Sequence, residues 1–129
     1  MAEIPSFIAV VDDDESMCQA LRRLLQVSGY LVRTYFSAEA FLADPEHAQA
    51  RFVVADIQLQ GMSGFDLQRT VHQMDPSVPF AFITAHDGAE TRAQAKACGV
   101  VAYLRKPFPA QTLIAAINNH LAEGGGCDQ

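Results

Sequence analysis

The chain has 129 residues, of which 50% are hydrophobic and 19% are charged, values typical of one globular domain rather than a disordered segment. Nine Lys and Arg residues against fifteen Asp and Glu residues give a net charge of −6, which disfavours direct binding to nucleic acid. No apolar run approaches the roughly 20 residues of a membrane-spanning helix, and the N-terminus lacks the features of a signal peptide, so we expect a cytoplasmic protein without a membrane partner.

Five short apolar runs, rich in β-branched and aromatic residues, predict five strands. In chain order they cover residues 7–11, 30–36, 52–57, 80–84 and 100–104. Three of these runs are nearly uninterrupted, which is typical of strands that are covered on both faces in a parallel sheet. The second run mixes polar with apolar residues, and this pattern favours a strand at the edge of the sheet.

Segments with helical spacing of apolar residues follow the five runs. The predicted helices cover approximately residues 17–28, 37–43, 67–74, 89–97 and 113–121. Ser37 is a good N-cap for the second helix, and glycines at positions 29, 99 and 124 are expected to end the first, fourth and fifth. We expect residues 5–122 to form one domain and residues 123–129 to be a flexible tail or the start of a linker.

Strands that alternate with helices indicate βαβ units with right-handed crossovers. Five such units predict an α/β fold with a doubly wound, five-stranded parallel sheet. In that architecture ligands bind beyond the carboxyl ends of the strands. The residues that follow each predicted strand are therefore the place to look for chemistry.

Polar side chains follow four of the five strands. Asp12 and Asp13 come after the first strand, Asp56 ends the third, Thr84 ends the fourth, and Lys106 follows the fifth. Carboxylates brought together repel one another, and a hard cation such as Mg²⁺ relieves the repulsion. An aspartate oxygen can attack phosphorus to form an aspartyl phosphate, while an ammonium and a hydroxyl are suited to contact the phosphoryl oxygens. The pattern predicts phosphoryl transfer to an aspartate.

These residues and their neighbours resemble the receiver domain of bacterial two-component response regulators over about residues 5–122. The resemblance rests on Val-Val-Asp-Asp-Asp at 10–14, Val-Ala-Asp-Ile-Gln-Leu at 54–59, Gly64, Ile-Thr-Ala at 83–85 and Tyr-Leu-Arg-Lys-Pro-Phe at 103–108. Ser-Ala-Glu-Ala-Phe-Leu at 37–42 makes the chain most similar to the receivers of nitrogen-fixation-type regulators. The resemblance implies a flavodoxin-like receiver fold with strand order 2-1-3-4-5.

The same resemblance assigns expected roles in the acidic cluster. Asp56 would be the phosphoacceptor, taking a phosphoryl group from a phosphohistidine on a sensor histidine kinase. Asp13 would bind Mg²⁺ directly and Asp12 mainly through water, and the backbone carbonyl of Gln58 would complete the protein's share of the metal ligands. The expected function is a phosphorylation-activated signalling switch that catalyses only its own phosphotransfer and dephosphorylation.

Further roles implied by the resemblance lie around the phosphoryl group. Thr84 and Lys106 would contact its oxygens, and a cis peptide between Lys106 and Pro107 would orient the lysine. Tyr103 would be an aromatic switch that turns inward as Thr84 moves, changing the surface of the fourth helix, fifth strand and fifth helix. That surface would control a downstream effector or a C-terminal output domain, as in the N-terminal receiver of a transcriptional regulator.

The loop after the phosphoacceptor departs from the family pattern. Many receivers have Met-Pro where this chain has Leu59 and Gln60, and without proline the loop is expected to be freer. Two large polar residues, Gln58 and His86, lie two positions after Asp56 and Thr84, and we hypothesise that they tune the lifetime of the phosphate. A phosphorylation-dependent homodimer could form through an exposed face of the fourth helix, with the charged residues Glu90, Arg92 and Lys96.

One alternative activity uses the same aspartate chemistry. Mg²⁺-dependent phosphohydrolases of the haloacid-dehalogenase type resemble Asp-x-Asp-x-Thr after the first strand, whereas residues 12–16 here read Asp-Asp-Asp-Glu-Ser. No insertion is long enough for a substrate cap. An interaction module with a degenerate site is a further alternative, and the complete set of polar strand ends argues against it.

Overall fold

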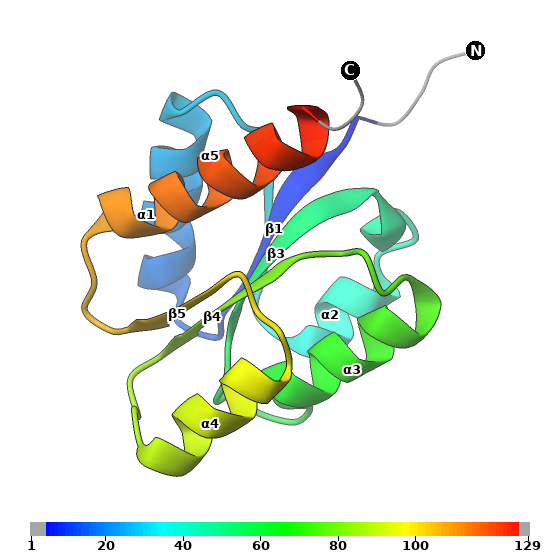
Figure 1. The fold of residues 1–129 in the computed structure, drawn as a ribbon. Coiled ribbons are helices and arrows are strands. Elements are labelled where there is room, and N and C mark those ends of the chain that lie inside the picture. The colour runs from blue at the N-terminus through cyan, green and yellow to red at the C-terminus, as the bar shows by residue number, and fades with distance from the viewer. Residues whose placement is uncertain (1–4, 127–129) are drawn as a thin grey trace.

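A parallel sheet forms the centre of the structure, a computed structural model that describes residues 5–126 (Figure 1). Its strand order is β2-β1-β3-β4-β5, as predicted. The strands are β1 (Phe7–Val11), β2 (Val32–Tyr35), β3 (Ala50–Asp56), β4 (Phe80–Thr84) and β5 (Ala102–Arg105). All neighbouring strands pair in parallel, so their carboxyl ends meet at one edge of the sheet.

Helices cover both faces of this sheet. They are α1 (Glu15–Val27), α2 (Ala38–Ala43), α3 (Gly64–Met74), α4 (Ala89–Ala97) and α5 (Ala110–Gly126), with a short 3₁₀ helix, η1 (His47–Gln49), before β3. Helices α1 and α5 lie on one face, and α2, α3 and α4 lie on the other (Figure 1). None of the helices in residues 5–126 has the length and apolar character needed to cross a membrane.

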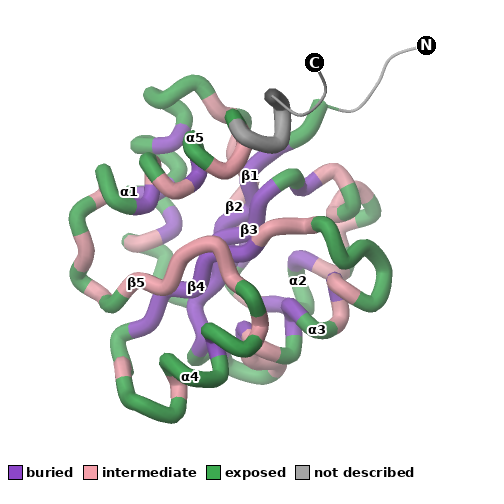
Figure 2. The backbone as a smooth tube through the Cα atoms, in the orientation of Figure 1, coloured by how far each residue is buried: buried purple, intermediate pink, exposed green. Residues whose placement is uncertain are grey.

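The core consists of two apolar layers separated by the sheet, and the strands form the buried centre of the backbone (Figure 2). Every residue of β1 and β4 is buried, which confirms the prediction that these strands are covered on both faces. Alternate side chains of β1 enter different layers: Ile8 and Val10 pack with α1 and α5, whereas Ala9 and Val11 pack with α2 and α3. Helix α4 contributes one buried residue, Ala95, to its layer.

Helix N-termini are fixed by side-chain caps that the sequence contains. Asp14 caps α1, where its Oδ1 accepts the backbone N–H groups of Ser16 and Met17. Ser37 caps α2, as predicted, by accepting the Ala40 N–H at 3.0 Å. These bonds satisfy backbone donors that have no partner within a helix. The Asp14 cap also fixes the direction in which the chain leaves the end of β1.

Several elements differ from their predicted bounds, among them the central strand β3, which covers Ala50–Asp56 rather than residues 52–57. Strand β2 begins at Val32 rather than at residue 30 because the Tyr30 N–H bonds back to the Leu25 carbonyl at the end of α1. Strand β5 begins at Ala102, two residues later than expected. Helix α5 continues to Gly126 instead of ending at Gly124, since glycine inside a helix disfavours it by only about 1 kcal/mol. Of the predicted tail, residues 127–129 lie outside the described residues.

Candidate functional site

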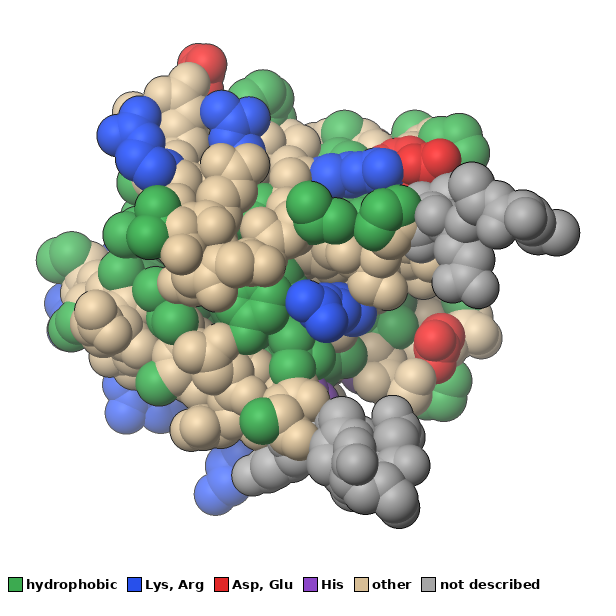
Figure 3. Space-filling view, turned by 90° about the horizontal axis from the view of Figure 1, so that it is seen from above, with side chains coloured by type: hydrophobic (Ala, Val, Ile, Leu, Met, Phe, Trp, Pro, Cys, Tyr) green, Lys and Arg blue, Asp and Glu red, His purple; other side chains and the backbone are tan. Residues whose placement is uncertain are grey.

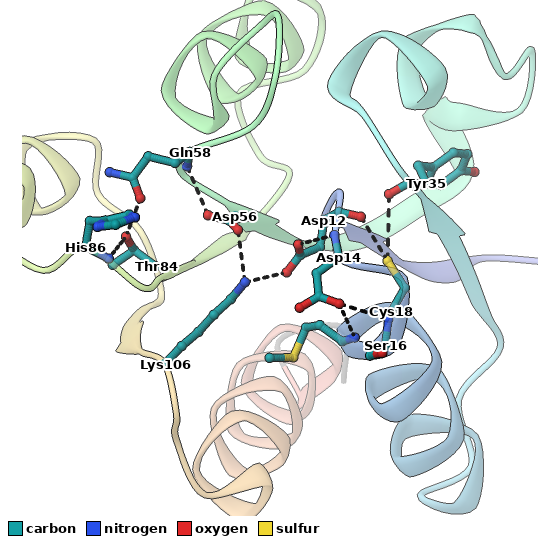
Figure 4. Close-up of polar contacts among 11 residues, drawn as sticks. Asp12, Asp14, Ser16, Cys18, Tyr35, Asp56, Gln58, Thr84, His86 and Lys106 are labelled. Atoms are coloured by element: carbon teal, nitrogen blue, oxygen red, sulfur yellow. Dashed lines mark hydrogen bonds and ion pairs between the residues drawn. The ribbon is translucent and has the colours of Figure 1, made fainter.

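Four polar residues predicted from separate parts of the sequence meet at the carboxyl edge of the sheet (Figure 4). Asp12 follows β1, Asp56 ends β3, Thr84 ends β4 and Lys106 follows β5. Parallel pairing of β1 with β3, of β3 with β4 and of β4 with β5 brings these strand ends side by side. Asp12, Asp56 and Thr84 are buried, and the Lys106 side chain reaches across to the two aspartates.

Lys106 joins the two buried aspartates. Its Nζ lies 2.8 Å from Asp12 Oδ2 and 2.9 Å from Asp56 Oδ2. The peptide bond between Lys106 and Pro107 is cis, as the family resemblance implied. One ammonium group thus balances part of the charge of two carboxylates that are both shielded from water.

Burial and charge pairing act in opposite directions on these groups. Burial raises the pKa of Asp12 above its ordinary value, and hydrogen bonds from Lys106 and from the Asp14 N–H oppose this change only in part. Burial lowers the pKa of Lys106, but its hydrogen bonds to Asp12 and Asp56 outweigh that effect, so its pKa is raised. The pairing therefore favours a charged lysine at this edge.

A third carboxylate completes an acidic cluster. Ligand oxygens of Asp12, Asp13 and Asp56 all lie within 4.8 Å of one another. Asp13 is exposed while the other two are buried, so the cluster opens to solvent on one side. Asp14 is turned away to cap α1 (Figure 4). Three carboxylates at this spacing are a donor set that suits a hard divalent cation such as Mg²⁺.

Thr84 is tied to both residues that we expected at the mouth of the site. Its hydroxyl donates to Gln58 Oε1 at 2.9 Å, and its oxygen accepts the His86 N–H at 3.0 Å. The Gln58 backbone N–H donates to Asp56 Oδ1 at 2.9 Å. Gln58 therefore contacts the aspartate through its backbone and the threonine through its side chain (Figure 4).

Tyr103 has partners that sequence reasoning did not identify. Its hydroxyl donates to Asp87 Oδ1 at 2.8 Å, and Asp87 also forms an ion pair with Arg92. The Arg92 guanidinium lies 5.8 Å from the centre of the Tyr103 ring. The hydrogen bond from Arg92 lowers the pKa of Asp87 most, and the hydrogen bond from Tyr103 lowers it further. Arg92 is exposed on the fourth helix, as expected, and it also connects that helix to the tyrosine of β5.

A comparison with known families identifies the family to which the chain belongs. Residues 8–118 match the family model described as the response regulator receiver domain. The chain belongs to the response regulator receiver family. Receiver domains are phosphorylation switches with an acidic pocket that binds Mg²⁺, and the cluster of Asp12, Asp13 and Asp56 corresponds to that pocket.

Curated relatives of this receiver domain include response regulators that are longer than this chain. It is 31% identical to the response regulator protein TmoT of Ectopseudomonas mendocina over 121 residues, 94% of this chain and 55% of TmoT. It is 32% identical to the transcriptional regulatory protein FixJ of Rhizobium meliloti over 110 residues, 85% of this chain and 54% of FixJ. The chain therefore spans about half the length of these curated relatives.

Solved structures confirm the fold of the receiver domain. A CheY-like receiver domain protein from Methanospirillum hungatei superposes with a TM-score of 0.84 at 27% identity, covering 93% of this chain and 96% of that one. The predicted strand order and α/β class are thus confirmed by both the topology and the comparison.

Proposed function

We propose that this receiver domain accepts a phosphoryl group on Asp56 from a sensor histidine kinase and thereby controls an output. The observation that supports this proposal is the Lys106 ammonium between Asp12 and Asp56 at the buried carboxyl edge. The Asp56 carboxylate lies beside the Lys106 ammonium and belongs to the acidic cluster. A phosphoryl group on Asp56 would therefore have a positive charge and metal ligands next to it.

The residues present fit a magnesium ion. Asp12, Asp13 and Asp56 would hold it with their carboxylates, and the backbone carbonyl of Gln58 would add a neutral oxygen. When bound, Mg²⁺ neutralises negative charge on the phosphoryl oxygens and on the carboxylates around them. Lys106, in the segment after β5, supplies a second positive charge beside the same carboxylates of Asp12 and Asp56.

The reaction itself needs little from the protein besides position and charge. An Asp56 oxygen forms a bond to phosphorus as the bond between phosphorus and the donor's imidazole nitrogen breaks. Lys106, within 2.9 Å of Asp56, lies close enough to contact an oxygen of the transferred group. Thr84 has one hydroxyl proton to donate, and giving it to the phosphoryl group requires leaving Gln58.

Movement of Thr84 would then reach Tyr103 and the surface of α4, β5 and α5. Tyr103 is hydrogen bonded to Asp87 in the segment between β4 and α4, and that segment begins directly after Thr84. Asp87 in turn holds Arg92 of α4. A change at Thr84 therefore has a short path, along the backbone to Asp87 and then through Arg92, to the helix that would present the output surface.

The class of partner that we propose is based on the net charge of the domain and on its longer relatives. The net charge of −6, together with basic side chains that are scattered rather than gathered on the face in Figure 3, favours a protein partner or output domain over nucleic acid for this domain. We propose that residues 5–122 are the receiver of a longer cytoplasmic transcriptional regulator, with 123–129 leading into its linker. Phosphorylation-dependent pairing through α4 is part of the same proposal.

Phosphorylation of Asp56 is tested by labelling the protein with acetyl phosphate or a histidine kinase in the presence of Mg²⁺. The Asp56→Asn variant is expected to take up no label, whereas Asp66→Asn, at an exposed aspartate of α3 paired with Arg69, should be labelled like the parent. Labelling that survives Asp56→Asn would refute the assignment. Sustained turnover of p-nitrophenyl phosphate would favour the phosphohydrolase alternative instead.

A further inference from the structure

The loop between β3 and α3 carries Gln58 and is fixed at both ends. At its start, the Gln58 N–H donates to Asp56 Oδ1. At its end, the Gly64 N–H donates to the Ile57 carbonyl at 2.9 Å. Gly64 packs so closely that a Cβ there would lie 2.5 Å from the Asp56 carbonyl oxygen. The base of the loop is therefore part of the phosphoacceptor strand.

The middle of the loop is held differently. Leu59 buries its side chain in the core, while Gln60 and Gly61 are exposed. Within the described chain, the hydrogen bond from the backbone of residues 59–62 to another element is the one from the Met62 N–H to Glu39 Oε2, at 2.9 Å. Glu39 lies in the first turn of α2, 23 residues before Met62.

The backbone at Gly61 lies close to the same Glu39 carboxylate. A Cβ built on Gly61 would lie 2.6 Å from Glu39 Oε2, which is closer than real Cβ contacts allow. Gly61 also has a φ of +78°, in the region that favours glycine. The glycine thus lets the loop backbone approach the carboxylate, and the carboxylate occupies the space that a side chain at position 61 would need.

We propose that Glu39 is a positioning residue for the phosphoryl site, because its carboxylate holds the loop in the conformation that directs Gln58 toward Asp56 and Thr84. An N–H bond to an ionised carboxylate is stronger than one between neutral groups, and it restrains a segment that Gln60 and Gly61 otherwise leave free. Glu39 is outside the acidic cluster, so it acts through the loop. The inference rests on the proposed function, since the loop carries the Gln58 carbonyl as a magnesium ligand.

The test measures Mg²⁺ affinity by calorimetry and exchange of the Met62 amide hydrogen by NMR in the metal-free protein. Glu39→Ala is expected to speed that exchange and to weaken Mg²⁺ binding by about three- to tenfold, as for the loss of one hydrogen bond. Glu39→Gln keeps an acceptor oxygen without the charge and should lose less affinity than Glu39→Ala. Adding Gln60→Pro to Glu39→Ala should restore affinity by stiffening the loop.

Glu46→Ala is the matched control, because Glu46 also accepts a hydrogen bond, from Arg33, but does not contact the loop. Its Mg²⁺ affinity should equal that of the parent. Unchanged affinity in Glu39→Ala would overturn the proposal, as would an equal loss in Glu39→Gln, which would point to charge alone, or an absence of rescue by proline. A parent that binds no Mg²⁺ would instead contradict the proposed function, before any variant is compared.

Discussion

Replacing Gln58 with leucine removes the acceptor that holds the Thr84 hydroxyl in the unphosphorylated protein. The hydroxyl has one proton, and in the structure this proton is given to Gln58 Oε1. A phosphoryl oxygen on Asp56 would compete for it. Gln58→Leu should therefore favour the state in which Thr84 turns toward the phosphoryl group, while leaving the Gln58 backbone contact to Asp56 in place.

The size of the effect follows from this hydrogen bond. A bond between uncharged groups contributes about 0.5–1.5 kcal/mol net, which corresponds to about a 2- to 13-fold change in an equilibrium constant. Thr84 is fully buried, whereas Gln58 is exposed, so water can partly replace the lost acceptor and the lower half of this range is expected.

The assay is a titration with beryllofluoride, a phosphoryl mimic, at saturating Mg²⁺, followed by NMR. The apparent dissociation constant of Gln58→Leu should fall by the factor given above, because a larger fraction of the protein is competent to bind. Gln60→Leu, at a neighbouring exposed glutamine that does not contact Thr84, should leave the constant unchanged. An equal or weaker affinity in Gln58→Leu would refute the view that Gln58 competes for the threonine.

Two further substitutions test the site and its packing. Lys106→Met leaves Asp12 and Asp56 without their shared ammonium, so we expect a loss of about 3–5 kcal/mol in unfolding free energy. The variant should also show a larger rise in Tm on adding Mg²⁺ than the parent, and an equal rise would mean that Lys106 does not balance this charge. Gly64→Ala places a Cβ 2.5 Å from the Asp56 carbonyl oxygen. This variant should unfold with about 1–3 kcal/mol less free energy than the parent and should be phosphorylated on Asp56 more slowly. Gly88→Ala, with open space around its Cβ, should change neither the stability nor the rate of phosphorylation.

The sequence predicted best what depends on continuous patterns. Strands β1 and β4 match their apolar runs residue for residue because every residue in each is buried. Strand β3 is also paired on both sides, but it begins at Ala50, two residues before its apolar run, and the exposed Arg51 hides this start in the sequence. The edge strands β2 and β5 were less well placed, since pairing from one side lets a neighbouring turn determine where a strand begins. The four polar strand ends could be brought together in advance because parallel pairing alone aligns their carboxyl ends.

Contacts made by loops could not be predicted in the same way. Asp87 and Tyr103 are 16 residues apart and Glu39 and Met62 are 23 apart, and neither pair belongs to a repeating pattern. Their meeting depends on the conformation of a whole loop, which for Glu39 includes the positive φ of Gly61. In retrospect, the glycine beside Gln60 was the one local sign that something approaches this backbone closely.

Helix α4 buries a single alanine, Ala95, although it is joined through Asp87 and Arg92 to the segment after Thr84. A methyl-sized contact contributes only about 1 kcal/mol of apolar burial, an amount comparable with one hydrogen bond. Under the proposed function, the chemistry at Asp56 would therefore act on a helix that has a single fully buried residue. The gain or loss of one hydrogen bond at the phosphoryl group would then be comparable in energy with the apolar contact that holds this helix through Ala95.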